Sequence, residues 1–472
     1  MSEASAAATV VERSDWLRAI VRLGARSITE PRSEGIAVAV LCPLLLTIAF
    51  WNGFPLIFYD TGAYIFQSFA DRFVPERSPV FSLFVRFAGG GVSLWLVAAV
   101  QVLLVSFVIV ETARAVVPKM TLAVLMAIGV GLVVLTALPW HVDQIEPDCF
   151  TGVAVLSLYL LAFHAKQLGG WRTFALFGIA ALATASHPSH LALAVGLVLL
   201  IALYRLSVVW RARADWPYAS VLLPLGSTIL GITLVLGANY HFTRHVFISH
   251  SGGVFSFARM MQDGIAKKVL DEACPHEHFR LCPYRDSFPP RADDYLWGPD
   301  SPFTTLHRFL GTEKESERIV SESFERFPML NLTMAMWDSV KQFIVFHTGD
   351  GIEPQQWVLA RDFRRFMPDQ LPAYDLARQQ KGSIAFFSVN VVHEPVAWAA
   401  LLGLIALLVV AVRERDGRAA AFFGFVLAAL IGNAIICGVF SGPHARYQSR
   451  LMWTPMLALA LVGADRHLLR QP

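Results

Sequence analysis

Charged residues are scarce in this chain of 472 residues: Asp, Glu, Lys and Arg make up 16%, against 55% hydrophobic residues. This composition excludes a soluble globular protein. The formal net charge of +3 is small for the length, and without a basic stripe or recognition motif we expect no nucleic-acid partner. The chain also lacks a Walker phosphate loop, a dinucleotide fingerprint, a nucleophile elbow and an HExxH zinc motif, so it offers none of the enzyme signatures carried by these motifs.

Cysteine is rare, with five residues in the whole chain. Three of them lie in or beside apolar runs and are interpreted as small hydrophobic residues: Cys42, Cys149 and Cys437. Cys274 and Cys282 lie eight residues apart in a polar region, which favours a disulfide in an oxidising compartment. A metal site that adds His276 and His278 is the alternative, although the spacing matches no standard site.

Long apolar runs are what the chain has in abundance. Each is long enough to cross a hydrocarbon core of about 30 Å, and the backbone in lipid must satisfy its own hydrogen bonds, so the runs are expected to be helices. The start of the chain lacks the form of a signal peptide, so the first run is interpreted as a retained span. We predict an all-α polytopic membrane protein with about ten transmembrane helices, at residues 35–54, 92–112, 119–138, 150–165, 172–186, 191–207, 218–239, 394–412, 419–440 and 451–465.

The runs divide the chain into four predicted parts. Residues 1–34 form a cytoplasmic amino-terminal segment, and residues 35–240 form a bundle of about seven spans, whose outer loop at 55–91 holds amphipathic helices. Residues 241–393 form a mostly helical extracytoplasmic domain, with too few interior apolar residues for a large core of its own. Residues 394–472 complete the bundle with about three spans.

The connectors between the runs differ in charge. The short connector at residues 140–148 holds Asp143, Glu146 and Asp148 with no Lys or Arg. Because short cytoplasmic loops collect Lys and Arg, we expect both termini in the cytoplasm and Asp60, Asp148, His187 and the 241–393 domain outside. Together with the predicted disulfide, this indicates a bacterial inner membrane with the domain in the periplasm. The basic connectors carry Arg114 and Lys119, Lys166 and Arg172, Arg205, Arg211 and Arg213, and Arg413, Arg415 and Arg418.

Asp60 lies at the start of the outer loop, directly after Phe58 and Tyr59. A carboxylate beside bulky apolar side chains at a water–lipid boundary can have a raised pKa and act as a general base. The alternative is that Asp60 caps the helix that it precedes.

The acidic connector brings Asp143, Glu146 and Asp148 to the next outer turn. Such a cluster can bind a divalent cation or hold an amine or hydroxyl. A solvated turn that helps to set orientation is the alternative, and Asp148 before an apolar run also fits an N-terminal helix cap.

Basic residues on the outer side form the third group. His187 and His190 flank Pro188 and could hydrogen-bond a phosphate oxygen, although a polar break between helices would look the same. Arg446 and Arg450 contradict the trend that places positive charge inside. They favour an anionic partner such as a lipid phosphate, with snorkelling to the outer headgroups as the alternative.

Taken in order, short motifs of this chain resemble the membrane glycosyltransferases of the C-type fold, and most nearly family 39 and the aminoarabinose transferases. The resemblance covers the first 150 residues and the last 40 or so, and residues 241–393 lie outside it. In those enzymes the first outer loop often opens with Asp-Glu, and Thr61 stands here in place of the Glu. The motifs are Asp60-Thr61-Gly62-Ala63-Tyr64, Arg77-Ser78-Pro79-Val80-Phe81, Asp148, and Arg446-Tyr447 followed by Trp453-Thr454-Pro455-Met456-Leu457.

The resemblance implies transfer of a sugar from a polyprenyl-phosphate donor to the hydroxyl of a lipid or glycan acceptor, on the extracytoplasmic face. It implies that Asp60 is the catalytic base and that Asp148 is a second catalytic residue, which orients the acceptor or supports a metal ion. A divalent cation remains open, because some relatives require one and others do not. The donor phosphate would be bound by Arg446, Arg77, His187 and His190, and the remaining substrate contacts would come from Tyr64, Tyr447, Asp143 and Glu146.

Two other functions stay open at this point. A transporter or flippase of a lipid-linked or anionic substrate would use polar residues within the spans, such as Gln101 and Asn433. A non-catalytic envelope assembly protein would use the 241–393 domain to bind a partner; Asn331-Leu332-Thr333 in it matches the N-glycosylation pattern, which matters only in a eukaryotic cell. The lack of internal repeats argues against a transporter, and the ionisable residues gather at one face, as in an enzyme.

Overall fold

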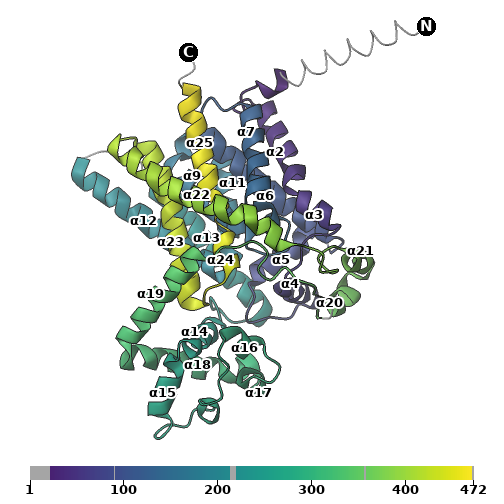
Figure 1. The fold of residues 1–472 in the computed structure, drawn as a ribbon, viewed down its shortest axis with the longest axis vertical. Coiled ribbons are helices and arrows are strands. Elements are labelled where there is room, and N and C mark those ends of the chain that lie inside the picture. Colours follow the sequence, from purple (N-terminus) through teal and green to yellow (C-terminus); the bar gives the residue numbers. More distant parts are fainter. Residues whose placement is uncertain (1–21, 90, 213–218, 356–357, 470–472) are drawn as a thin grey trace.

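The computed structural model describes residues 22–89, 91–212, 219–355 and 358–469 (Figure 1). Within these ranges the regular elements are α-helices and short 3-10 helices, and the only β-type pairings are two isolated bridges. The predicted all-α class is confirmed. The first 21 residues of the predicted cytoplasmic segment, and Arg213, lie outside the described part of the chain.

A helix occupies each of the ten predicted apolar ranges. Six stretches of the described residues are long and apolar enough to cross a membrane: Arg32–Asn52, Leu94–Val116, Pro188–Ser207, Ala219–Thr243, Phe386–Arg413 and Gly417–Phe440. The other helices are shorter, so the predicted count of about ten spans is not confirmed. The bundle comprises α2 (Pro31–Leu45), α3 (Thr47–Asn52), α6 (Leu94–Val116), α7 (Leu122–Leu135), α9 (Cys149–Phe163), α11 (Gly170–Ala185), α12 (Pro188–Ala212), α13 (Ala219–Thr243), α22 (Phe386–Arg413), α23 (Gly417–Phe440) and α25 (Trp453–Leu469).

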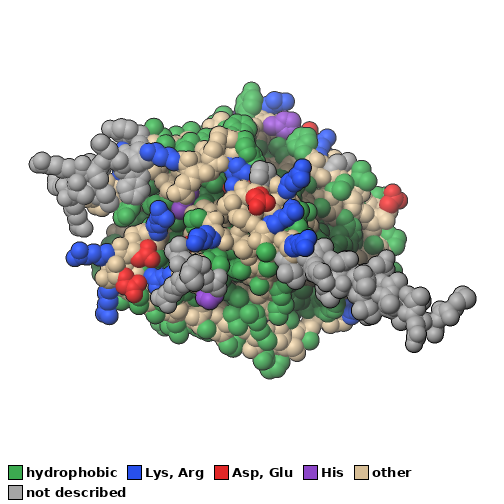
Figure 2. Space-filling model, turned by 90° about the horizontal axis from the view of Figure 1, so that it is seen from above, with side chains coloured by type: hydrophobic (Ala, Val, Ile, Leu, Met, Phe, Trp, Pro, Cys, Tyr) green, Lys and Arg blue, Asp and Glu red, His purple; other side chains and the backbone are tan. Residues whose placement is uncertain are grey.

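One end of the bundle carries both ends of the chain (Figure 1). Figure 2 looks onto this end and shows Lys and Arg side chains spread across it. Beneath them lies a buried ion network, in which Arg114 and Arg172 each pair with both Glu34 and Glu111. The two acids and two arginines balance in charge, which is the condition for burying them.

The predicted helices of the outer loop are α4 (Tyr59–Ala70) and α5 (Pro79–Gly89). Both pack into the main core rather than standing apart from it, with Tyr64, Ile65 and Phe81 at most 1% exposed. The N-cap of α4 is Phe58, and Asp60 lies in the first turn without capping it. The structure therefore does not support the alternative that Asp60 caps this helix.

Residues 254–319 have a hydrophobic core of their own, separate from the bundle core. It is built by α14 (Gly252–Gln262), α15 (Ile265–Ala273), α16 (Ala292–Trp297), α17 (Pro302–Thr305) and α18 (Arg308–Arg326). The sequence predicted too few interior apolar residues for a large core here, and this core has fewer buried residues than that of the bundle. Aromatic residues of α16 and α17 contribute to it, among them Tyr295 and Phe303, which are fully buried.

The second part of the predicted 241–393 domain belongs to the bundle instead. After α19 (Pro328–Ile344), the short helix α20 (Val358–Phe366) packs against α4. The short helix α21 (Leu371–Leu376) follows, and just beyond it the backbone N–H of Arg378 donates to the carbonyl oxygen of Asn52 in α3. Phe363 and Tyr374 are fully buried in the main core. Helix α22 begins at Phe386, eight residues before the predicted span at 394.

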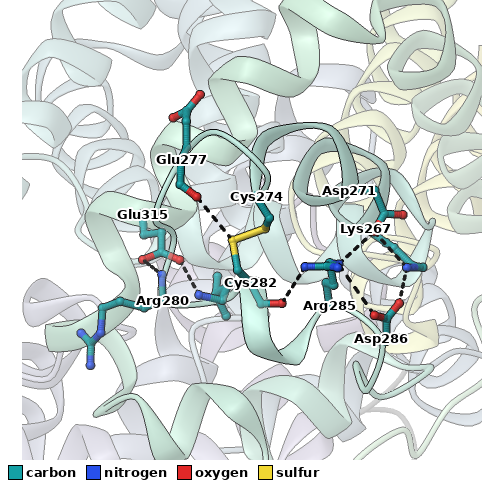
Figure 3. The surroundings of a disulfide bond; sticks show 10 residues. Lys267, Asp271, Cys274, Glu277, Arg280, Cys282, Arg285, Asp286 and Glu315 are labelled. Carbon is teal, nitrogen blue, oxygen red and sulfur yellow. Dashed lines mark hydrogen bonds and ion pairs between the residues drawn. A yellow bond between two sulfur atoms is a disulfide. The ribbon is translucent and has the colours of Figure 1, made fainter.

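Cys274 and Cys282 form the predicted disulfide, with their Cα atoms 5.8 Å apart (Figure 3). The loop that it closes is also held by Glu315 of α18, whose carboxylate accepts the backbone N–H groups of Arg280 and Leu281 at 3.0 and 2.8 Å. In the described residues no group of three His, Cys, Asp or Glu side chains could hold a metal ion. The alternative of a Cys/His metal site is not supported.

The close packing of α9 against the segment at Trp453 allows a test of the fold. A Cβ atom at Gly152 would lie 2.4 Å from the buried Trp453 ring, so Gly152→Ala should destabilise the protein by about 1–3 kcal/mol. Gly178→Ala in α11 is the matched control, because nothing lies within 4 Å of its Cβ position. Thermal unfolding in detergent should show a lower Tm for the first variant only; equal Tm values would contradict this packing.

Candidate functional site

Three segments far apart in the sequence meet at the end of the bundle opposite the chain termini. Residues 142–148 are held in place there by buried backbone hydrogen bonds. Leu56 donates to the Asp143 carbonyl oxygen and accepts from the Ile145 N–H, each at 2.9 Å. The Gln101 amide donates to the carbonyl oxygens of Val142 and Gln144. These bonds satisfy groups that would be costly to bury unpaired, and they bring the acidic connector beside α4.

Asp60 and Arg77 form an ion pair, with side chains 15% and 11% exposed. The proposed base and one of the proposed phosphate ligands are therefore partners of each other. The Arg77 guanidinium also lies 5.7 Å from the Trp297 ring centroid. Through Trp297 the disulfide-bearing domain reaches the site.

Asp148 lies between two arginines. Arg450 donates to it at 2.7 Å, and the Nε atom of Arg446 is 3.5 Å from its other carboxylate oxygen. Arg446 also approaches Glu146, at 3.5 Å, and its guanidinium lies 4.0 Å from the centroid of the Phe58 ring. The site thus combines two buried carboxylates and two arginines at one point, with the Asp60–Arg77 pair alongside.

The pKa values of the two buried carboxyl groups are shifted in opposite directions. Burial raises the pKa of Glu146 well above its usual range, and the negative charge of Asp60 raises it further. Burial also acts to raise the pKa of Asp148, but Arg446 and Arg450 outweigh it and hold that pKa well below the usual range. The pKa values of two neighbouring acids are thus moved apart, which favours the protonated form for Glu146 and the carboxylate form for Asp148.

The two tyrosines expected at the site lie there. Tyr64 is buried against Phe81, and burial together with the charges of Glu146 and Asp60 raises its pKa well above the usual value. The Tyr447 ring lies 5.1 and 5.3 Å from the guanidinium carbons of Arg446 and Arg450. Both rings therefore lie beside the charged side chains of the site.

The two histidines are not equivalent. His190 hydrogen-bonds Thr151 at 2.7 Å and the Ala183 carbonyl oxygen at 3.0 Å, so both ring nitrogens are used within the fold. The structure does not support a phosphate contact from this residue. His187 instead lines a pocket together with Arg77. Burial, His190 and Arg450 lower the pKa of His187 well below its usual value, so it is neutral and acts as a hydrogen-bonding group.

Asp143 does not join the site. Its carboxylate accepts the backbone N–H of Ala49 at 2.7 Å, in the first turn of α3. The substrate contact expected for Asp143 is replaced by a structural role, because a buried acid at a helix N-terminus stabilises the unpaired N–H groups there.

The acidic connector does not fit a divalent cation. The Asp143 carboxylate is turned to α3, Asp148 pairs with two arginines, and Glu146 approaches Arg446 at 3.5 Å. A cation site needs carboxylate oxygens that converge with surplus negative charge, and these three side chains do not supply one.

Two further residues belong to the site. Arg450, for which the sequence favoured an anionic lipid partner or snorkelling, is instead fully buried and donates to Asn433 and Ser189 as well as to Asp148. Asp350 was not assigned a role from the sequence. Asp350 accepts the backbone N–H of Arg446 at 3.0 Å. No local pattern indicated Asp350, because its partner lies 96 residues away in the sequence.

Comparison of the chain with protein-family models, with curated proteins and with solved structures gave no match. The function of the site must therefore be argued from its geometry.

Removal of the Asp148 carboxylate, which pairs with Arg450, should destabilise the protein. Asp148→Asn leaves that fully buried guanidinium without its 2.7 Å partner, so the free energy of unfolding should fall by about 3–5 kcal/mol. Asp271→Asn is the matched control, since its carboxylate is 45% exposed and pairs on the surface. Denaturant or thermal unfolding in detergent should separate the two variants; an unaffected Asp148→Asn protein would contradict the role of the pair.

The raised pKa of Glu146 predicts how stability depends on pH. The folded chain binds this proton more tightly than the unfolded chain, so the stabilisation is complete below the unfolded pKa of about 4.3 and is lost as pH rises through the folded value. Glu146→Gln mimics the protonated acid and should lose this contribution to the pH dependence of Tm. A series of Tm measurements from acidic to alkaline pH checks this; parallel curves for the two proteins would be the contrary result.

Proposed function

We propose that the protein is a membrane glycosyltransferase that moves a sugar from a polyprenyl-phosphate donor to an acceptor hydroxyl. The observation that carries the proposal is the convergence of Asp60, Arg77, Glu146, Asp148 and Arg446 at one end of an apolar helix bundle. Proton-accepting and phosphate-binding groups thus lie together where an amphipathic substrate can reach them.

The pocket beside Arg77 supports a donor of this kind. Its lining combines Arg77 and His187 with apolar side chains of four helices and two loops, including Leu191, Val235 and Phe247. An arginine and a hydrogen-bonding histidine suit a phosphate, and the apolar walls suit the first units of an isoprenoid chain.

In the proposed reaction, the acceptor oxygen attacks the anomeric carbon and its proton passes to the Asp60 carboxylate. The bond between the anomeric carbon and the phosphate oxygen breaks, the configuration inverts, and the lipid phosphate leaves with both electrons of that bond. Arg77 and Arg446 stabilise the developing negative charge in a site largely closed to water. Because Arg77 holds Asp60 in this structure, a donor phosphate that engages Arg77 would free the carboxylate to act as base.

Glu146 and Asp148 are equally buried, each 1% exposed. Glu146 approaches the Arg446 guanidinium at 3.5 Å, so the substrate contact expected for it is replaced by support of that arginine. Asp148 is enclosed by arginines and less than 2% exposed, so we assign it to positioning Arg446 rather than to reaction with the substrate. The expected catalytic role of Asp148 is revised accordingly.

The alternative of a transporter finds little support in the spans. The Gln101 amide donates to two backbone carbonyl oxygens, and the Asn433 amide donates to the Tyr447 carbonyl oxygen and to the Gln448 side chain. The amide N–H groups of both side chains are therefore used within the fold, although the Gln101 Oε1 atom is buried without a partner. The enzyme is therefore the function that we favour.

We place the site on the extracytoplasmic face of a bacterial inner membrane. The basic end of the bundle would face the cytoplasm with both termini, as the distribution of Lys and Arg favours. The disulfide domain at the other end would lie in the periplasm, where disulfides persist.

Asp60→Asn should lower sugar transfer by about 100-fold or more, because the amide cannot accept the acceptor proton. Asp71→Asn is the control: it lies at the other end of α4, its side chain is 64% exposed, and Asn tolerates its backbone φ of 53°. Transfer of labelled sugar from polyprenyl-phosphate donors is measured in membranes that contain equal amounts of each protein. Full activity of Asp60→Asn would remove the assigned base, and substrate flux in sealed vesicles without any glycosyl product would favour the transporter.

A further inference from the structure

Helix α19 has its polar and apolar faces reversed relative to a helix on a water-soluble domain. The side chains that it buries are polar: Asn331, Asp338 and Gln342. The large side chains that it exposes are apolar and between 48% and 70% accessible, and they recur at helical spacing: Met329, Leu332, Met336, Trp337, Val340 and Ile344. A surface helix in water shows the opposite arrangement.

The buried polar side chains of α19 are used to hold the helix in place. The Gln342 amide both donates to the carbonyl oxygen and accepts from the N–H of His444, at 2.8 and 2.9 Å. The Asn331 amide donates to the carbonyl oxygens of Ser323 and Phe327. Asn331 is only 2% exposed, so the glycosylation pattern that it begins is not an accessible acceptor.

The polar side chains on and beside the exposed face of α19 have partners within the protein. The Thr333 hydroxyl donates to the Met329 carbonyl oxygen within the helix, at 2.8 Å. The two charges of the helix, Lys341 and Asp338, lie 3.8 Å apart, and the ammonium group is 5.2 Å from the Trp337 ring. Paired charges and an interfacial Trp with Lys are compatible with lipid.

The helices that pack beside α19 indicate the environment of its exposed face. A Cβ atom at Gly438 would lie 2.7 Å from the Asp338 carbonyl oxygen, so α19 packs directly on α23, one of the helices able to span the membrane. Ile431 and Ile435 lie on the same side of α23 as Gly438, at helical spacing, and are exposed. Just beyond α19, Phe346 packs on Trp398 of α22, another such helix. The apolar face of α19 therefore continues the exposed apolar surface of two candidate spans.

We propose that α19 is a membrane-contacting helix whose exposed face lies against lipid acyl chains. Its 17 residues measure about 26 Å, short of the roughly 30 Å hydrocarbon core, so it dips into the bilayer without crossing it. The range in which the sequence predicted a wholly extracytoplasmic domain thus contains a lipid-embedded element. This inference does not depend on the proposed sugar transfer.

The experiment uses full-length protein in phosphatidylcholine vesicles with nitroxide-labelled acyl chains. An environment-sensitive fluorophore is attached to Met336→Cys or Val340→Cys in a Cys42→Ala background, since Cys149 and Cys437 are buried and the other two cysteines are bonded. Glu325→Cys on α18, exposed in the same domain, is the matched control. Labels on α19 should be quenched by the lipid nitroxides several-fold more strongly than the control label, and less by aqueous iodide.

Two results would overturn the proposal. Iodide quenching at Val340→Cys as strong as at Glu325→Cys would place this face in water. Protection from both quenchers, with disulfide cross-linking of Val340→Cys between two copies, would show that a second copy covers it. Trp337→Phe in the otherwise unmodified chain gives an independent measurement, because it should reduce the quenching of intrinsic tryptophan fluorescence by the same lipids.

Discussion

A guanidinium without solvent contact needs a counter-charge and hydrogen-bond acceptors, because desolvation of an unpaired ion costs several kcal/mol. Arg450 meets this condition through Asp148 at the start of α9, Ser189 at the start of α12 and Asn433 on α23. The bonds converge from three helices, so their relative positions depend on this one side chain. Arg446, one helical turn earlier, is thereby directed towards Glu146 and Phe58.

This arrangement accounts for the different chemistry of neighbouring carboxylates. Burial raises the pKa of Glu146, and the nearby charge of Asp60 adds to this, although Arg446 and Arg77 act to lower it. Burial also acts to raise the pKa of Asp148, but Arg446 and Arg450 outweigh it. The balance between burial and neighbouring charges therefore differs between two acids that lie only two residues apart.

The site is also linked to the surface of the molecule through α19. Gln342 binds the backbone at His444, two residues before Arg446, and Asp350 in the following loop accepts the Arg446 N–H. Gly351 lies against the Phe58 ring, where a side chain would not fit. A helix that we place in lipid therefore leads directly into the loop that contacts Arg446.

Several features follow from the sequence alone, because they depend on local pattern. Apolar runs predict helices, because backbone N–H and C=O groups in lipid must form their hydrogen bonds within the segment. A helix is found at each of the ten predicted ranges, and six stretches of the described residues are long and apolar enough to span a membrane. The disulfide of Cys274 and Cys282 was predicted from a spacing of eight residues. What only the tertiary structure decided is which polar groups meet. Asp143 and His190 resemble site residues in sequence but are used within the fold, whereas Arg450 and Asp350 belong to the site through partners 302 and 96 residues away. A charge pattern gives the side of the membrane on which a residue lies, but the partner that sets its protonation is chosen by packing between distant helices.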